Sequence, residues 1–352
     1  MSVARQLRCE RMNYLVRLIA IASACFVAGC ASPPGTHAIP TRPEQWLLSY
    51  DGTYQRSAPD EDFYVSAFAG APGAECRTGL FSGVIFLGVQ NAQAGKWYAP
   101  WANKSTPTRD ATLEDWFTYI DTLAAVNGPF ARLDRAAARI DGRSVDIVVM
   151  IPALMREPSG AVRIAARSVD VATDSGRAIY TSYLDSLRAK FKRGGFSRLR
   201  LRGAYWLRES AWGDEATIAR QVANVVHARG LQFFWIPYYG AGGVAEWRSL
   251  GFDAAWLQPN YFLRPELTNT RLDSALALAK SYGMGLEIEM DGRLFSQPAS
   301  RARLADYLDA VAEDPTLPIA LYDGGGTLVN VFRDTTQALD PLRTRIATTL
   351  CR

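Results

Sequence analysis

Acidic side chains in two short segments of this sequence could act together as a pair of carboxylates. Glu209 follows the apolar stretch of GAYWLRES, and GLEIEMDG carries Glu287, Glu289 and Asp291. The three acids of the second segment alternate with apolar residues, so in a β-strand they would share one face. Acids on the inner face of a sheet are costly to bury without a partner or a function. Two carboxylates on opposite sides of a pocket are the basic machinery for cleaving a glycosidic bond.

The elements around these segments alternate between strand-like and helix-like patterns. Apolar runs typical of buried strands cover 46–52, 80–89, 145–154, 198–206, 231–239, 252–261, 283–290 and 317–326. Amphipathic, helix-like segments lie at 112–126, 174–192, 214–229, 244–249, 270–282, 300–313 and 340–348. Apolar strands separated by helices are typical of a parallel sheet covered on both faces. Eight such units predict an α/β fold, a (β/α)8 TIM barrel built as a single domain over 45–352.

A barrel would bring the acids together, because it gathers the C-terminal ends of its strands around one pocket. Glu209 would follow the fourth strand, and Glu289 would end the seventh. We expect Glu209 to be the general acid and Glu289 the nucleophile. Carboxyl groups about 5–5.5 Å apart would predict a retaining mechanism, and about 6.5–9.5 Å an inverting one. The alternative is that Glu209 is an exposed loop acid and Glu289 a member of a salt bridge.

The other two acids of GLEIEMDG would have supporting places. Asp291 would lie near the mouth of the barrel, and Glu287 deeper inside it. We expect Glu287 to pair with a buried arginine such as Arg200 or Arg202.

Aromatic and polar side chains cluster at or beyond the predicted strand ends. Flat rings stack on the apolar faces of sugars while polar groups bind the hydroxyls. The predicted substrate-binding residues are Trp97, Trp101, Tyr205, Trp235, Tyr238, Tyr239, Gln258, Asn260, Tyr261, Glu287, Asp291, Tyr322 and Asp323. Tyr98, Trp206 and Trp212 belong to the same aromatic cluster. For any single ring, packing in the core is the alternative, so the argument depends on their concentration at one end.

Other kinds of site have little support in the sequence. The chain has two histidines, His37 and His227, so a Ser-His-Asp triad or a histidine-ligated metal is not expected. No glycine-rich phosphate loop follows a strand, and no Asp-rich loop suggests calcium. Residues 1–29 hold four arginines and one glutamate, which account for three of the four formal positive charges. The remaining charge of about +1 is too small to indicate binding to the phosphates of a nucleic acid. We also expect no cofactor.

The amino-terminal region has the features of an export signal. Four arginines precede or begin an apolar run that ends in Val27-Ala28-Gly29-Cys30, which resembles a bacterial lipoprotein box. We expect 1–29 to be a lipoprotein signal peptide, Cys30 to be lipidated, and the Pro-rich stretch 30–44 to be a flexible tether. The alternatives are a simple signal peptide and, less favoured, a transmembrane anchor, for which the run is far short of about 20 residues. Ala31 favours the outer membrane, facing the periplasm or the cell surface.

Two cysteines remain after the signal, Cys76 and Cys351, one near each end of the predicted barrel. The first and last elements of a closed barrel are neighbours, and an exported chain folds in an oxidising compartment. We expect a disulfide between them, and the alternative is two separate buried thiols.

Two long runs resemble a known family. FFWIPYYGAGGVAEWRSLGFDAAWLQPNYFL and GMGLEIEMDGR are similar to motifs of a bacterial family of secreted barrel proteins catalogued as domain of unknown function 4855, over most of 45–345. The resemblance implies a TIM barrel distantly like the retaining glycoside hydrolases, whose acid/base and nucleophile follow the fourth and seventh strands. Glu209 and Glu289 match those places. That clan usually has an asparagine before the acid/base, where this sequence has Arg208.

The leading hypothesis is therefore an envelope-anchored glycoside hydrolase that cleaves a carbohydrate polymer. It would contact the membrane through its lipid and need no protein partner. The main alternative is a non-catalytic carbohydrate-binding lipoprotein, and a third is an envelope scaffold. Two opposed carboxylates favour the hydrolase, because binding alone does not need them.

Overall fold

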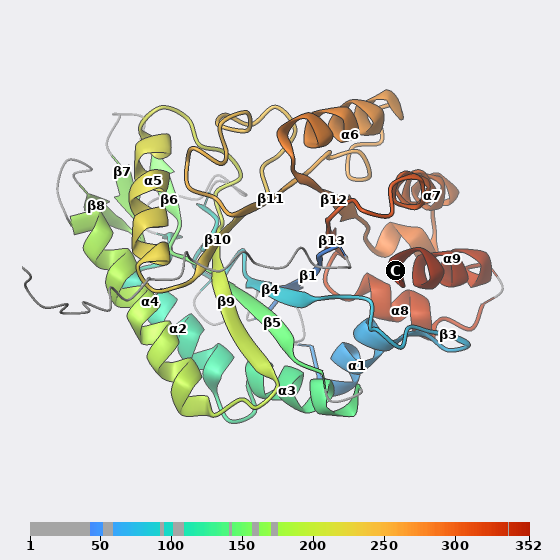
Figure 1. The fold of residues 1–352 in the computed structure, drawn as a ribbon, viewed down its shortest axis with the longest axis horizontal. Helices are drawn as coiled ribbons and strands as arrows, with labels where there is room; N and C mark the ends of the chain where they lie inside the picture. Colours follow the sequence, from blue (N-terminus) through green and yellow to red (C-terminus); the bar gives the residue numbers. More distant parts are fainter. Residues whose placement is uncertain are drawn as a thin grey trace, which may run out of the picture. The chain divides into compact units, whose positions relative to one another are not determined.

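Eight parallel strands close into a barrel in the order β1-β13-β12-β11-β10-β9-β5-β4 (Figure 1). The computed structural model describes residues 43–51, 59–91, 95–100, 109–140, 143–156, 162–169, 175–336 and 338–352. The barrel strands are β1 (Gln45–Tyr50), β4 (Gly83–Leu87), β5 (Val145–Met150), β9 (Leu199–Trp206), β10 (Gln232–Trp235), β11 (Ala254–Leu257), β12 (Gly285–Glu289) and β13 (Ile319–Tyr322). Each coincides with one of the eight predicted runs, so the predicted α/β barrel is confirmed.

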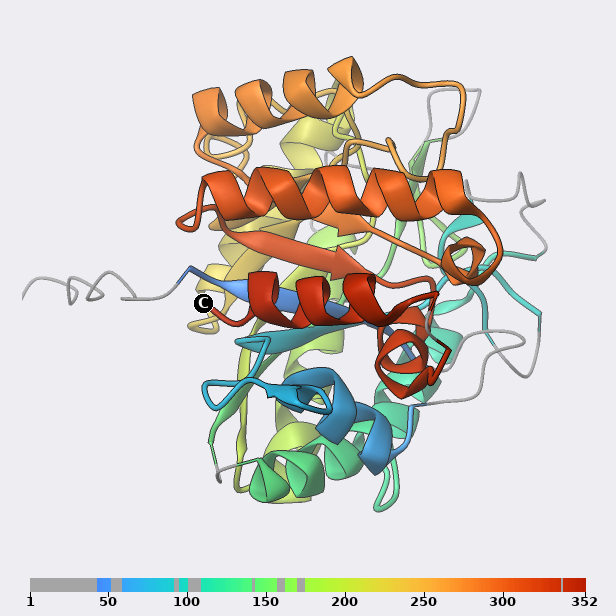
Figure 2. The same cartoon turned by 90° about the vertical axis from the view of Figure 1, so that its right-hand side faces the viewer.

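Helices form the outer layer around these strands (Figure 1). They are α1 (Glu61–Ala69), α2 (Leu113–Ala124), α3 (Pro129–Arg139), α4 (Ser175–Gly194), α5 (Asp214–His227), α6 (Thr270–Tyr282), α7 (Pro298–Glu313), α8 (Thr327–Arg333) and α9 (Asp340–Leu350). In Figure 2, α7 and α9 run along one flank of the barrel, drawn in orange-red and red. No helix in the described part of the chain is both long and apolar enough to cross a membrane.

Several elements differ from those expected. The segment 244–249 forms turns in place of a short helix, because glycines with positive φ at Gly243 and Gly251 bound it and a helix this short is costly to nucleate. Helices α1, α3 and α8 were not predicted. Two small antiparallel sheets were also not predicted: β2 (Gly70–Ala71) with β3 (Ala74–Glu75), and β6 (Leu154–Arg156) with β7 (Val162–Ile164) and β8 (Arg167–Val169).

The interior of the barrel is filled by large rings from strands that lie across from one another. Trp46 meets Phe234 edge to face with 4.9 Å between ring centroids, and its ring lies 6.3 Å from that of Trp256. Gly285 leaves the space that Trp256 fills, since a Cβ at this glycine would lie 2.3 Å from the indole. These rings show which residues of each strand face the barrel interior. Because side chains alternate along a strand, every second residue from Trp46 or Phe234 also faces inward, and we call this the inward parity.

Beneath these rings, a charged network closes the end of the barrel where the strands begin. Asp146 accepts hydrogen bonds from Arg200 Nε at 2.7 Å and from Arg202 Nη1 at 3.0 Å. Arg202 also pairs with Glu44, just before β1. The predicted pairing of Glu287 with one of these arginines is therefore wrong, because both arginines serve acids at the opposite end of the barrel.

A disulfide joins Cys76 to Cys351, the pair suggested by the sequence, with 2.07 Å between the sulfurs and a sequence separation of 275. Nearby, the side-chain amide of Gln45 donates to the carbonyl of Leu80 at 2.5 Å and to that of Leu350 at 2.9 Å. The start of β1, the segment before β4 and the end of α9 are thus linked where the barrel closes.

Candidate active site

A small cavity lies at the C-terminal ends of the barrel strands. Its volume is about 70 Å³, and it is lined by Leu48, Tyr50, Leu87, Val89, Ala99, Tyr205, Leu207, Glu209, Ile236, Gln258 and Glu287. On β1, β10 and β12 these residues continue the inward parity set by Trp46, Phe234 and Gly285. The lining combines apolar walls with two carboxylates, two phenols and one amide.

Glu209 and Glu287 are the two carboxylates of this cavity. Glu209 lies three residues beyond β9 and is half-buried. Burial raises its pKa to about 7, against the opposing charge of Arg208. Glu287 lies on β12 and is 1% exposed. Burial raises its pKa well above the ordinary range, the negative charges of Glu289 and Glu209 raise it further, and a hydrogen bond with Gln258 opposes them. The two acids therefore share one cavity and interact electrostatically within it.

Glu289 has a different environment from the one expected for a nucleophile. It is fully buried and is not among the residues that line the cavity. One oxygen, Oε2, accepts hydrogen bonds from the Tyr307 hydroxyl at 2.6 Å and from the backbone N–H of Phe262 at 3.2 Å. Burial raises its pKa to about 7 in spite of these donors. In the structure the second carboxylate of the cavity is thus Glu287, two residues earlier on the same strand.

Tyr50 belongs to the site and was missed in the sequence. Its ring meets that of Tyr322 edge to face at 5.6 Å between centroids, and it lines the cavity with Tyr205. Burial raises the pKa of Tyr50 well above its usual value, with further contributions from Tyr322 and Glu287. The signal was present in the sequence, because Tyr50 has the parity of Trp46 and ends the first strand.

Two of the predicted sugar-binding rings belong to the core. Trp235 stacks on Phe252 with 4.7 Å between centroids and 13° between planes, and its Nε1 donates to the carbonyl of Arg208 at 2.9 Å. It alternates with the inward Phe234, so it must face the helices. Tyr261 donates its hydroxyl to Asp306 at 2.7 Å and packs against Tyr307. Neither ring lines the cavity.

Two predicted polar ligands also have other partners. Asp291 is paired with Arg293, with 2.9 Å between Oδ2 and the guanidinium. Asp323 is 1% exposed and accepts the backbone N–H groups of Gly325 and Gly326 at 2.9–3.1 Å. These contacts fix turns beside the barrel mouth, so the two carboxylates are held by the fold.

The remaining predicted residues are spread around the mouth. Tyr238 donates its backbone N–H to the carbonyl of Glu209, and Tyr239 lies under the guanidinium of Arg271 at 4.2 Å. Asn260 adopts a positive φ of 57°. Trp97 lines a separate small cleft. Trp101 and the predicted lipidation site Cys30 lie outside the described residues.

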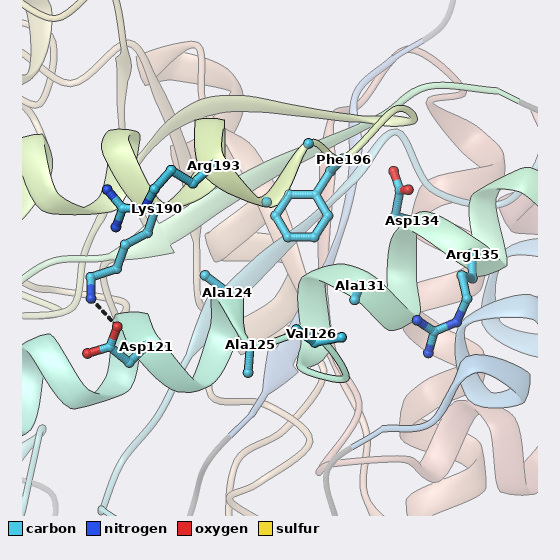
Figure 3. A pocket seen from close by; sticks show the side chains of 12 residues that line it. Asp121, Ala124, Ala125, Val126, Ala131, Asp134, Arg135, Lys190, Arg193 and Phe196 are labelled. Atoms are coloured by element: carbon cyan, nitrogen blue, oxygen red, sulfur yellow. Dashed lines mark hydrogen bonds and ion pairs between the residues drawn. The ribbon is translucent and has the colours of Figure 1, made fainter.

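A larger groove on the described surface lies elsewhere. It measures about 550 Å³ and lies between α2, α3 and the end of α4 (Figure 3). Lys190 pairs with Asp121 along one side, and Phe196 borders it just before β9 begins. This is the end of the barrel where strands start, whereas functional sites of this fold lie where strands finish. The groove therefore does not compete with the carboxylate cavity.

The described residues were also compared with the pattern of a metal site. Within the described ranges, no group of three or more histidine, cysteine, aspartate or glutamate side chains is placed to hold an ion. The one described histidine, His227, bonds to Asp253 at 2.8 Å on the outer surface. The polar side chains that line the cavity carry carboxyl, phenol and amide groups.

Comparison with known proteins identifies a family. Residues 45–347 match the profile described as "Domain of unknown function (DUF4855)". No curated protein matches the chain.

Several solved structures are distantly similar. A GH26 β-mannanase from Bacteroides ovatus is 12% identical with a TM-score of 0.43, and the match covers 81% of this chain and 82% of the mannanase. The PgaB (BpsB) glycoside hydrolase domain from Bordetella bronchiseptica is 12% identical with a TM-score of 0.42, covering 86% and 98%. Pyruvate carboxylase from Rhizobium etli is 8% identical with a TM-score of 0.38, covering 88% of this chain and 27% of the carboxylase. These proteins differ in chemistry, so the likeness does not indicate an activity.

Proposed function

This chain belongs to the family described as Domain of unknown function (DUF4855), and we propose that it is a glycoside hydrolase whose reacting carboxylates are Glu209 and Glu287. The observation that carries the proposal is their meeting in one cavity, although they come from strands far apart in the sequence. Glycosidic cleavage by two carboxylates needs one protonated group and one ionised group on opposite sides of the bond. Two other small cavities at this end of the barrel each have a single acid in their lining, Asp110 in one and Asp323 in the other.

Glu209 is the proposed proton donor. A pKa raised to about 7 keeps a large fraction of its carboxyl protonated at neutral pH, as a general acid requires. Its half-buried place at the rim lets solvent return the proton after each turnover.

Glu287 is the proposed partner that faces the sugar carbon. The reaction needs Glu287 ionised, although burial and the negative charges of Glu289 and Glu209 raise its pKa well above the ordinary value. The positive charge that develops on the sugar in the transition state would favour its ionised form. This assignment replaces Glu289, whose bonded oxygen is directed to Tyr307 and Phe262.

The test is reducing-end release from four soluble polymers that present neutral, cationic and anionic sugars: mannan, xylan, glycol chitosan and hyaluronan. We expect the wild type to cleave at least one of them. Glu209→Gln and Glu287→Gln should each slow cleavage by roughly 10²–10⁴-fold, the usual contribution of a positioned acid or base. Glu289→Gln should retain most of the rate, because a glutamine oxygen can accept both hydrogen bonds that reach Oε2.

The outcomes separate the assignments. Cleavage of none of the polymers by the wild type overturns the hydrolase proposal. A full rate in Glu209→Gln or in Glu287→Gln removes that residue from the pair. If Glu289→Gln is as slow as Glu287→Gln is expected to be, the second carboxylate is Glu289 after all. The wild-type rate should fall as the pH rises above about 7, because Glu209 then loses its proton.

A non-catalytic carbohydrate-binding protein is the second candidate, favoured by the volume of the cavity. About 70 Å³ is well below the roughly 300–1,000 Å³ of common small-molecule sites. Binding of a polymer by the wild type without any release of reducing ends would support this candidate.

We also propose that the chain is anchored in the outer membrane through a lipid on Cys30, after removal of 1–29 and with 30–44 as a tether. The Val27-Ala28-Gly29-Cys30 run and the disulfide between Cys76 and Cys351, which suits an oxidising compartment, support this proposal. Metabolic labelling with a fatty acid should mark the wild type and not Cys30→Ser. Equal labelling of the two would contradict it.

A further inference from the structure

The segment that carries Glu209 continues into an exposed tryptophan. Trp212 is 54% exposed, and among the described residues Val126 and Phe295 are the other large hydrophobic side chains that are exposed. It lies three residues after Glu209, so the two Cα atoms are at most about 11 Å apart by the reach of the chain. The backbone of Trp212 is therefore within about 11 Å of that of an acid that lines the cavity.

The backbone of this segment is held by the neighbouring loop. The N–H of Ala211 donates to the carbonyl of Gly242 at 2.9 Å, and the carbonyl of Glu209 accepts from the N–H of Tyr238 at 3.3 Å. Both partners lie between β10 and β11. The loop after β9 and the loop after β10 are thus joined at Glu209 itself and two residues later at Ala211.

A buried carboxylate holds the tryptophan itself. Oε2 of Glu215 accepts the backbone N–H of Trp212 at 3.0 Å, and its Oε1 lies 3.5 Å from Nη2 of Arg208. Glu215 is only 2% exposed, although it is charged and lies in the first turn of α5. An ion pair between half-buried Arg208 and buried Glu215 thus connects the residue before Glu209 to the backbone of Trp212, and the segment is fixed at both ends.

One face of the indole rests on bare backbone. A Cβ added to Gly242 would lie 2.4 Å from Cδ2 of Trp212 and 2.7 Å from Cε2 and Cε3, so the ring lies directly on this glycine. The side chain is nevertheless more than half exposed. The structure thus presents an aromatic ring supported from below and open to solvent, a few residues from a proposed catalytic acid.

We propose that Trp212 is the stacking platform of a carbohydrate subsite beside Glu209. The inference rests on the proposed function and deepens it, because it makes the substrate a polymer that continues beyond the cavity over the loop after β9. The cavity of about 70 Å³ cannot enclose several sugar units, so most of a polymer must be bound outside it. A ring on a segment that is already fixed loses little conformational freedom when a sugar stacks on it.

The test measures binding in a catalytically blocked background. The Glu209→Gln variant is run by native electrophoresis through gels that contain mannan, xylan, glycol chitosan or hyaluronan. The slowing of the protein by each polymer measures its affinity for that polymer. We expect at least one polymer to retard it. Adding Trp212→Ala should weaken that affinity about tenfold, the loss expected for an aromatic stacking contact. Trp212→Phe should retain most of the affinity, because a smaller ring still stacks.

Gly242→Ala provides a second variant that leaves the tryptophan in place. Its φ is not in the left-handed region, so alanine is compatible with the backbone, while the new Cβ displaces the indole. We expect a loss of affinity similar to that of Trp212→Ala. Val126→Ala is the matched control, since Val126 is 88% exposed at the other end of the barrel, and it should change nothing. Near-ultraviolet circular dichroism checks that each variant is folded.

The results distinguish the two proposals. If a polymer retards Glu209→Gln and the further change Trp212→Ala leaves that affinity unaltered, the platform is refuted and the hydrolase proposal is untouched. If the wild type cleaves none of the four polymers and Glu209→Gln binds none, both proposals fail.

Discussion

Asp51 should make the stability of this protein depend on pH. It follows β1 on the outward face and is fully buried. Its Oδ2 accepts hydrogen bonds from Ser49 Oγ at 2.6 Å and Tyr64 Oη at 3.0 Å, while Oδ1 has no partner among the described residues. Burial raises its pKa from 3.8 to about 6, against these two donors and the charge of Arg132.

The magnitude follows from this shift. The folded state binds the proton of Asp51 more tightly than the unfolded chain does. The contribution to stability is therefore complete below the unfolded pKa and is lost as the pH rises through the folded value. A shift from 3.8 to about 6 corresponds to roughly 3 kcal/mol. Asp51→Asn has no proton to lose, and its oxygen can accept both hydrogen bonds. In this variant the amide nitrogen of asparagine replaces Oδ1. Because the amide does not titrate, any effect of this nitrogen on the free energy of unfolding is the same at every pH.

Urea unfolding followed by tryptophan fluorescence at about pH 4 and about pH 8 measures the effect. We expect the wild type to lose about 2–3 kcal/mol more than Asp51→Asn between these conditions. The control is Asp273→Asn, which removes an exposed acid on α6 and should leave the wild-type pH dependence in place. If the wild type and Asp51→Asn lose the same free energy over this range, the assigned pKa and its physical cause are both refuted.

Two further predictions concern the closure of the barrel and a turn at its mouth. Replacing Cys76 and Cys351 by serine should lower the free energy of unfolding by roughly 4–5 kcal/mol, because the bond closes a loop of 275 residues. Equal urea midpoints without reductant would contradict this. Gly324→Ala should lower it by roughly 2–3 kcal/mol, because Gly324 has a φ of 61° and a new Cβ would lie 2.7 Å from Cβ of Asp291. Gly292→Ala has open space around its Cβ, so its thermal midpoint should stay near that of the wild type.

The barrel could be predicted because most of its strands are continuous apolar runs. These runs are separated by helix-like segments that can be recognised in a single sequence. The boundaries of β1, β9 and β12 each lie within a few residues of the predicted runs. The turns at 244–249 were mistaken for a helix, since Val244, Trp247 and Leu250 mimic helical spacing. In the fold these residues are buried by the turns instead.

The site was harder to predict, because successive side chains at the end of a strand alternate between the barrel interior and the surrounding helices. Trp235 and Asp323 were counted as lining the mouth, yet each is outward by the parity that Phe234 and Tyr322 establish. Tyr50 was not among the predicted residues, although it lies near the end of the first predicted run. The identity of the second carboxylate depended on the loop after β11, whose Phe262 N–H binds Glu289. The residues of GLEIEMDG do not by themselves predict the contact between Phe262 and Glu289, because the loop and the strand are distant in sequence.

The direction of β1 has a consequence for how the cavity is presented. All eight barrel strands run in parallel, so Gln45 lies at the end that Asp146, Arg200 and Arg202 close, and Tyr50 at the end that holds Glu209. Whatever precedes β1 therefore joins the fold on the side away from the carboxylates. The opening beside Glu209 therefore faces away from the point where the described chain begins, and a substrate can reach the carboxylates without passing the start of β1.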